Sequence, residues 1–280
     1  MTCDILATLH SPADVQRLDD RQLDECCAQI RETLVEFGKR AGGHIGSNLG
    51  LVETSVALHV VFDSPLDKIV FDVSHQSYVH KMLTGRAEAF LNAELFGSVS
   101  GFTNPAESEH DHFVLGHTGT SISLACGLAK ERNMVATTGA VPQTRNVIAV
   151  IGDGALSSAI AFEGLNNAGS DKMTDILVIL NDNNMSIDKS QGALNRYLLR
   201  LSTSTKYNRL KQWLWSTLSR TPRLLNFCRK IANAIKHGLL QNSNLFESLG
   251  FRYFGRVDGH NIKNFDLSAF RAQIGYVQQE

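Results

Sequence analysis

The sequence has little that would place the protein in a membrane or in an oxidising compartment. It has 5 cysteines among 280 residues, two of them adjacent, and no Cys-x-x-Cys pair. An odd number of cysteines without paired spacing is typical of reduced thiols that serve as small apolar residues. The sequence also lacks a basic start followed by an apolar run, and no stretch approaches the roughly 20 apolar residues that span a bilayer. We therefore expect a cytoplasmic protein without a membrane partner.

An excess of charge of one sign is missing as well. The formal net charge is -1 and the pI is about 6.8. The chain as a whole therefore has no electrostatic reason to bind nucleic acid. Proline is scarce, with 5 residues, whereas hydrophobic residues make up 43% of the chain. This composition is typical of a globular protein that buries a core, and we expect a single domain over residues 1–280.

Charge is unevenly distributed despite the nearly neutral total. Residues 189–246 contain 11 lysines and arginines but no aspartate or glutamate. Leucine, tryptophan and phenylalanine interleave with these basic residues, as they do in amphipathic helices. We expect this stretch to be a mobile helical insertion with a solvated basic face. The alternatives are a lid that attracts phosphate and a surface that docks a partner.

The hydrophobic pattern predicts alternating helices and strands. Asp19 or Asp20 can cap a helix whose apolar positions recur every three or four residues up to Phe37, and Gly42-Gly43 ends it. Buried parallel strands are expected over 69–73, 147–151 and 176–180, and further helices over 51–61, 121–132 and 158–168. This order predicts an α/β fold, a parallel sheet flanked by helices, with a ligand at the carboxyl ends of the strands.

The most informative segment spans the second and third predicted strands. The second strand ends in Gly152-Asp153-Gly154, and Asn181-Asp182-Asn183 follows the third. A dinucleotide fingerprint is the obvious competitor, but Ser157 stands where that fingerprint needs its third glycine. The side-chain oxygens of Asp153 and Asn183 are hard donors suited to Mg²⁺, which bridges carboxylates to diphosphates. The glycines would let the backbone approach the anion at the start of the following helix.

Gly-Asp-Gly, with an asparagine after the next strand, resembles the thiamine diphosphate motif. Five further motifs occur in the order seen in the 1-deoxy-D-xylulose-5-phosphate synthase family. They are GGHIGSNLG at 42–50, FDVSHQSYVHK at 71–81, ESEHD at 107–111, GHTGTSIS at 116–123 and VDGH at 257–260. The resemblance runs from about residue 19 to residue 262 and concerns only the N-terminal, diphosphate-binding domain of that transketolase-like family. It implies the thiamine diphosphate-binding fold of transketolase N-terminal domains.

The resemblance also implies roles for individual positions. His44 would stand close to the reacting carbon and take part in proton transfer, which suits an imidazole at neutral pH. His75 would contact the cofactor. The other cofactor-binding positions would be Gly116, His117, Thr118, Gly154, Ala155 and Asn183. The metal would be held by Asp153, Asn183 and the backbone carbonyl of Met185.

Three positions depart from the pattern or leave their role open. Ser74 stands where the family usually has glycine, so a side chain enters a tight turn and could shift His75. Gly119 replaces a residue with a hydroxyl, which is expected to loosen the loop that lines the cofactor. His80 is either a second active-site imidazole or a capping or core residue.

The implied reaction condenses pyruvate with glyceraldehyde 3-phosphate, with loss of carbon dioxide, to give a precursor of isoprenoids and thiamine. Thiamine enzymes of this type also need a glutamate that promotes cofactor activation, and the family carries it in a second domain that we do not find after His260. We therefore expect a homodimer or a hetero-oligomer with a chain that carries the pyrimidine-binding domain. The alternatives are a non-catalytic remnant or regulatory module, and the N-terminal subunit of another split transketolase.

Overall fold

The computed structural model describes residues 5–140, 144–171, 174–181 and 245–253. The chain divides into two compact units, one of Met1–Ile187 with Val257–Glu280 and the other of Asp188–Arg256. In the second unit the described residues form helix α14 (Leu245–Ser248), and the rings of Phe246 and Tyr253 stack with centroids 5.6 Å apart. Apart from its last two residues, the predicted insertion at 189–246 lies outside the described residues, so its character stays a prediction.

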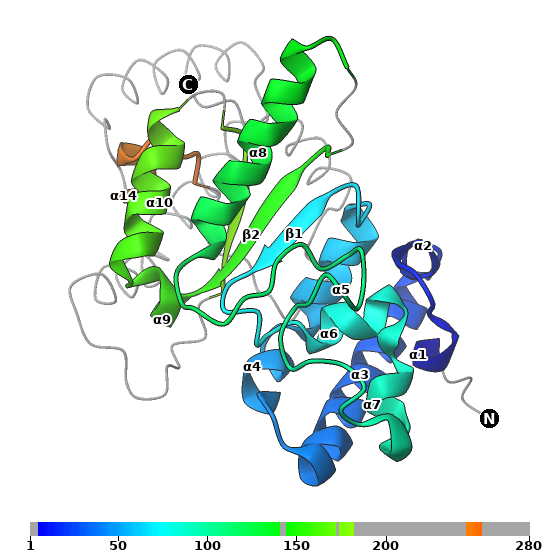
Figure 1. Ribbon diagram of the computed structural model, residues 1–280. Coiled ribbons are helices and arrows are strands. Elements are labelled where there is room, and N and C mark those ends of the chain that lie inside the picture. Colours follow the sequence, from blue (N-terminus) through cyan, green and yellow to red (C-terminus); the bar gives the residue numbers. More distant parts are fainter. Residues whose placement is uncertain (1–4, 141–143, 172–173, 182–244, 254–280) are drawn as a thin grey trace, which may run out of the picture. The chain divides into compact units, whose positions relative to one another are not determined.

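A parallel sheet forms the centre of the first unit (Figure 1). Its described strands are β1 (Lys68–Phe71), β2 (Val147–Gly152) and β3 (Leu177–Asn181), in the order β1-β2-β3. Residues 147–151 of β2 are all buried, as the continuous apolar run predicts for a central parallel strand. The predicted parallel strands are thus confirmed. β1 ends earlier than expected because Val73 and Ser74 adopt positive φ angles, which interrupt the regular extended conformation of a strand.

Helices flank this sheet, as the sequence pattern predicts. Helix α8 (Ser121–Thr137) contacts β1 and β2, and α10 (Ala159–Ser170) packs beside α8 (Figure 1). From α5 (Val52–Val61) and the residue after it, Leu58 and Phe62 pack against the sheet in a cluster with alternate strand residues, namely Ile69, Phe71, Ile148 and Val150. The alternation follows from the period of two along a strand.

Helix α3 (Asp20–Ala41) begins and ends where local signals in the sequence place it. Asp19 accepts a hydrogen bond from Gln22 N, and the Gln22 side chain accepts one from Asp19 N, which is a capping box. Gly42 follows the helix with a φ of 74°, a conformation that favours glycine. The buried residues of α3 are Leu23, Cys26, Cys27, Ile30, Leu34 and Phe37, the apolar stripe predicted from their spacing.

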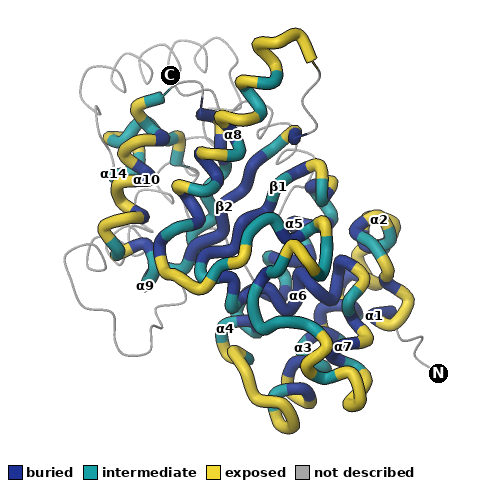
Figure 2. The backbone as a smooth tube through the Cα atoms, in the orientation of Figure 1, coloured by how far each residue is buried: buried dark blue, intermediate teal, exposed yellow. Residues whose placement is uncertain are grey.

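Shorter helices complete a helical layer around α3. They are α1 (Ile5–Thr8), α2 (Pro12–Val15), α4 (Ile45–Leu49), α6 (Tyr78–Lys81), η1 (Met82–Arg86), α7 (Glu88–Leu91) and η2 (Ala93–Leu95). Buried apolar residues between Ile5 and Phe90 form one cluster in this layer, and Figure 2 colours the buried stretches of its backbone dark blue.

The described cysteines behave as the apolar residues that their spacing predicts. Cys26, Cys27 and Cys126 are free and buried. Burial raises the pKa of Cys26 and Cys27 to about 12, so their thiols stay protonated at neutral pH. Among the helices of the described ranges, none has both the length and the apolar character to cross a membrane.

Candidate functional site

The carboxyl end of β2 carries the predicted metal ligand Asp153. Gly152 closes the strand, pairs with Asn181 of β3 and serves as the N-cap of α9 (Asp153–Leu156). Asp153 is therefore the first residue after the strand, with 7% of its surface exposed. A largely buried carboxylate at the edge of a parallel sheet, beside the end of the next strand, is a hard oxygen donor placed where such sheets bind ligands.

The other two predicted metal ligands, Asn183 and Met185, lie outside the described residues. Over 5–140 and the other described stretches, no three histidine, cysteine, aspartate or glutamate residues come together as a group that could hold a metal. The complete ligand set therefore stays a prediction, with Asp153 as its described member.

The carboxyl end of β1 holds a residue whose importance the sequence did not reveal. Asp72 is buried, and its two carboxylate oxygens accept hydrogen bonds from the backbone N–H groups of Gly119 (2.7 Å) and Ser121 (2.9 Å). One side chain thus ties the end of β1 to the start of α8. It also fixes the loop that carries the predicted cofactor-binding residues, which are Gly116, His117 and Thr118, all exposed.

Gly119 is required by the packing of this loop. Its φ is +83°, and a Cβ atom placed on it would lie 1.9 Å from Ser158 Oγ, just before α10. Ser158 in turn caps α10, because its hydroxyl accepts a hydrogen bond from Ala161 N. Gly119 lacks the hydroxyl that the family usually has at this position, but its backbone N–H is held by the carboxylate of Asp72. The loop lies directly against the segment that follows Asp153 and α9.

The turn after β1 brings His75 to the same region in a constrained backbone. Val73 and Ser74 have φ angles of 59° and 67°, so both are in the left-handed region that glycine prefers. The Ser74 side chain is fully buried, and its Oγ accepts a hydrogen bond from Thr103 N at 3.0 Å. The prediction of a tight turn at this position is thus confirmed, and its extra side chain has a partner.

His44 and His75 meet at this turn. Their ring centroids are 5.1 Å apart, with planes at 80°, and the ring of Phe102 contacts His44 at 5.9 Å. His44 is exposed, whereas His75 is half-buried. Burial and the neighbouring His44 lower the pKa of His75, and the Asp72 carboxylate opposes this effect. The Nδ1 atom of His75 is buried and has no hydrogen-bond partner among the described residues.

Asn48 holds the two histidine segments together, a role that the sequence did not reveal. Its side-chain NH₂ group donates to His44 O at 2.9 Å and to His75 O at 2.8 Å, and its Oδ1 accepts from Tyr78 N at 2.9 Å. Asn48 is fully buried, so these bonds are not exchanged with water. An asparagine in a glycine-rich motif is a recognisable signal, but its partners lie 27 and 30 residues away along the chain.

His80 belongs to the core and not to the open site. It is fully buried, its Nδ1 lies 2.9 Å from His59 Nε2, and its Nε2 lies 3.2 Å from Asp111 Oδ1. Burial lowers its pKa, while the hydrogen bond to the Asp111 carboxylate raises it. Of the two roles that the sequence leaves open for His80, the structure therefore supports the core role.

The family profile described as 1-deoxy-D-xylulose-5-phosphate synthase matches residues 6–273. The chain belongs to this family. A relative with that name from Symbiobacterium thermophilum is 46% identical over 261 residues, which is 92% of this chain and 39% of the relative. Its namesake from Syntrophomonas wolfei is 45% identical over 280 residues, covering 99% of this chain and 42% of the relative. The chain thus spans about two fifths of the length of these relatives.

A solved structure supports the fold independently. A transketolase from Leishmania mexicana superposes with a TM-score of 0.53 over 64% of this chain and 30% of the transketolase chain. Only 21% of the aligned residues are identical, so the likeness concerns the fold. The predicted family and the predicted α/β fold of the transketolase type are both confirmed.

Proposed function

We propose that this chain is the thiamine diphosphate- and Mg²⁺-binding part of a 1-deoxy-D-xylulose-5-phosphate synthase. The observation that carries the proposal is the site at the carboxyl edge of the sheet, in a chain of that family. There the buried Asp153 follows β2 directly. The unpartnered Nδ1 of His75 lies beside the exposed His44.

The residues present fit the cofactor and its metal. Asp153 offers a carboxylate oxygen of the kind that Mg²⁺ prefers, and it lies in the first turn of α9, next to Gly154 and Ala155. The exposed residues Gly116, His117 and Thr118 would line the cofactor, and Asn183 and Met185 would complete the metal site. When bound, thiamine diphosphate supplies the electron sink for loss of carbon dioxide from pyruvate and condensation with glyceraldehyde 3-phosphate.

The chain's own residues would bind, orient and move protons around this cofactor. His44 is exposed and held at its backbone carbonyl by Asn48, so its imidazole is placed to exchange a proton with a bound reactant. The lowered pKa of His75 keeps that imidazole neutral near pH 7, which allows Nδ1 to donate or accept one hydrogen bond. Asp72 would orient the loop of Gly116, His117 and Thr118 through its bonds to the backbone N–H groups of Gly119 and Ser121.

Because the chain spans about two fifths of its relatives' length, we propose synthase activity only for this sequence together with the remainder of that length. We propose that this remainder, on the same polypeptide or on a partner chain in a homodimer or hetero-oligomer, carries the pyrimidine-binding domain. The competing function is a binding module without turnover. Activity that appears on mixing this chain with such a polypeptide supports the first proposal, and cofactor binding without activity in that mixture supports the second.

Calorimetry with thiamine diphosphate tests the proposed cofactor site. We expect binding that depends on Mg²⁺, because the carboxylate of Asp153 would otherwise repel the diphosphate. Asp153→Asn should weaken the Mg²⁺-dependent binding by at least about tenfold, a loss of about 1.4 kcal/mol. Glu163→Gln removes the same charge from an exposed position on α10 and should bind like the unmodified chain. Equal affinity with and without Mg²⁺ would contradict the bridging role.

A further inference from the structure

The segment from Ser100 to Asp111, called the wall below, borders His44 and the turn that carries His75. Its Phe102 ring contacts the ring of His44, with centroids 5.9 Å apart. The next residue, Thr103, donates its backbone N–H to Ser74 Oγ, in the turn that carries His75. Two consecutive residues of one irregular segment thus touch the two elements of the site.

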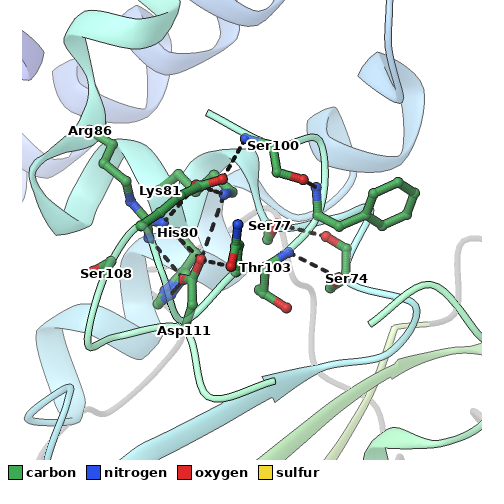
Figure 3. Close-up of polar contacts among 12 residues, drawn as sticks. Ser74, Ser77, His80, Lys81, Arg86, Ser100, Thr103, Ser108 and Asp111 are labelled. Carbon is green, nitrogen blue, oxygen red and sulfur yellow. Dashed lines mark hydrogen bonds and ion pairs between the residues drawn. The ribbon is translucent and has the colours of Figure 1, made fainter. Parts of the chain in front are cut away.

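This wall is anchored on either side of its contact residues. Ser100 N donates to Glu107 Oε1 at 2.6 Å, and Asn104 N donates to Asp111 Oδ2 at 2.8 Å. The two carboxylates therefore hold the backbone just before Phe102 and just after Thr103. Figure 3 shows Ser100, Thr103, Ser74 and Asp111 within this network of dashed contacts.

Both anchoring carboxylates pair with cations of the helical layer, the buried Lys81 and the partly buried Arg86. Lys81 is fully buried and pairs with Glu107, and its Nζ lies 3.6 Å from Asp111 Oδ2. Arg86 donates to both carboxylate oxygens of Asp111, at 2.8 and 2.9 Å. A buried charge without its partner is strongly unfavourable, so each cation holds its carboxylate in place. Because the cations lie on α6 and η1 and the carboxylates on the wall, these pairs fix the wall to the core.

We propose that Glu107 and Asp111 are positioning residues, which act through Phe102 and Thr103 to hold His44 and the His75 turn in their observed geometry. They reach the imidazoles only through the wall, so they are not catalytic residues. The importance of this role for catalysis rests on the proposed function. Its test measures geometry without turnover, so the two proposals can fail separately.

The test compares Glu107→Ala with Glu109→Ala, two carboxylates of the same motif. Glu109 is exposed and serves as the matched control. The readout is the chemical shift of the His44 ring protons in the full chain, because the ring of Phe102 shifts nearby nuclei. A Phe102→Leu variant gives the signal without that ring. We expect Glu107→Ala to move the His44 signal toward its position in Phe102→Leu, and Glu109→Ala to leave it unchanged.

A merely structural role for Glu107 would lower the melting temperature and leave the His44 signal of the folded protein where it was. That result overturns the proposal. If Glu107→Ala does not fold, Ser74→Ala decides the question, because it removes the acceptor of Thr103 N–H together with only one longer hydrogen bond, of 3.5 Å, to Leu115 O. We then expect faster hydrogen exchange at Thr103 and a shifted His44 signal, and the absence of both changes overturns the proposal.

Discussion

The imidazole of His44 meets the imidazole of His75 edge to face, with centroids 5.1 Å apart. Asn48 stabilises this arrangement, since its side chain donates hydrogen bonds to the backbone carbonyls of both residues. The exposed His44 and the half-buried His75 are therefore both held by the side chain of Asn48. This contact couples the two residues, because the neighbouring His44 is one cause of the lowered pKa of His75.

The coupling predicts a change in the titration of His75. Replacing His44 with Gln should raise the pKa of His75, because the neighbouring imidazole is one of the two causes that lower it. The pKa should stay below its ordinary value, because burial is the larger cause and remains. NMR titration of the His75 ring measures the effect. His117→Gln is the control, since His117 is not among the causes of the shift, and an unchanged pKa in His44→Gln would count against the coupling.

Asn48 should matter more for stability than an exposed asparagine. Asn48→Ala removes the side-chain partner of the His75 carbonyl and of the Tyr78 N–H, and one of the two donors to the His44 carbonyl, so we expect a loss of about 1–3 kcal/mol in the free energy of unfolding. Urea denaturation measures this loss. Asn166→Ala, at an exposed position of α10, should change stability by no more than about 0.5 kcal/mol. Similar values for both variants would show that the bridge contributes little.

Gly119 should not tolerate a methyl group. A Cβ atom would overlap Ser158 Oγ, and the positive φ is unfavourable for alanine, so Gly119→Ala should lower stability by about 1–3 kcal/mol. Gly127→Ala provides the contrast, because Gly127 lies within α8 and nothing stands within 4 Å of its added carbon. That variant should be neutral or more stable by up to about 1 kcal/mol. Thermal unfolding of the two proteins decides the matter, and a Gly119→Ala protein as stable as the parent would refute the steric account.

Stability should fall on mild acidification. Burial lowers the pKa of His110 to about 4 and that of His112 to about 3. Both rings are neutral in the folded chain at pH 5 but become protonated on unfolding, where their pKa is near 6.5. The contribution of these two neutral rings to the free energy of unfolding is therefore fully present above the pKa of unfolded histidine and is lost as the pH falls toward 4. Urea midpoints at pH 7 and pH 5 measure the loss, and His112→Gln should reduce the difference between them.

The sequence predicts those parts of the fold that depend on local signals. The cap at Asp19, the apolar stripe from Leu23 to Phe37 and the glycine end of α3 lie within one helix, and all three predictions are confirmed. The continuous apolar run of β2 predicts a buried strand equally well, because a central parallel strand needs no polar face. The end of β1 was placed too late, since two non-glycine residues with positive φ leave no mark in the hydrophobic pattern.

The candidate site was predictable only in part. The family motifs named His44, His75 and Asp153, but the supports of these residues come from distant positions. Asp72 meets Gly119 across 47 residues, and Lys81 meets Glu107 across 26. Such pairings depend on tertiary packing, which spacing along the chain does not encode.

The pairing of β1 with β2 has a consequence for the order of folding. Lys68 pairs with Val147, so this part of the sheet cannot form until a long loop has closed, which costs chain entropy. The bonds of Asn48 to His44, His75 and Tyr78 close much shorter loops, within a helical cluster that runs from Ile5 to Phe90. We therefore expect the two imidazoles to be assembled early during refolding, before the strand that delivers Asp153 has joined them.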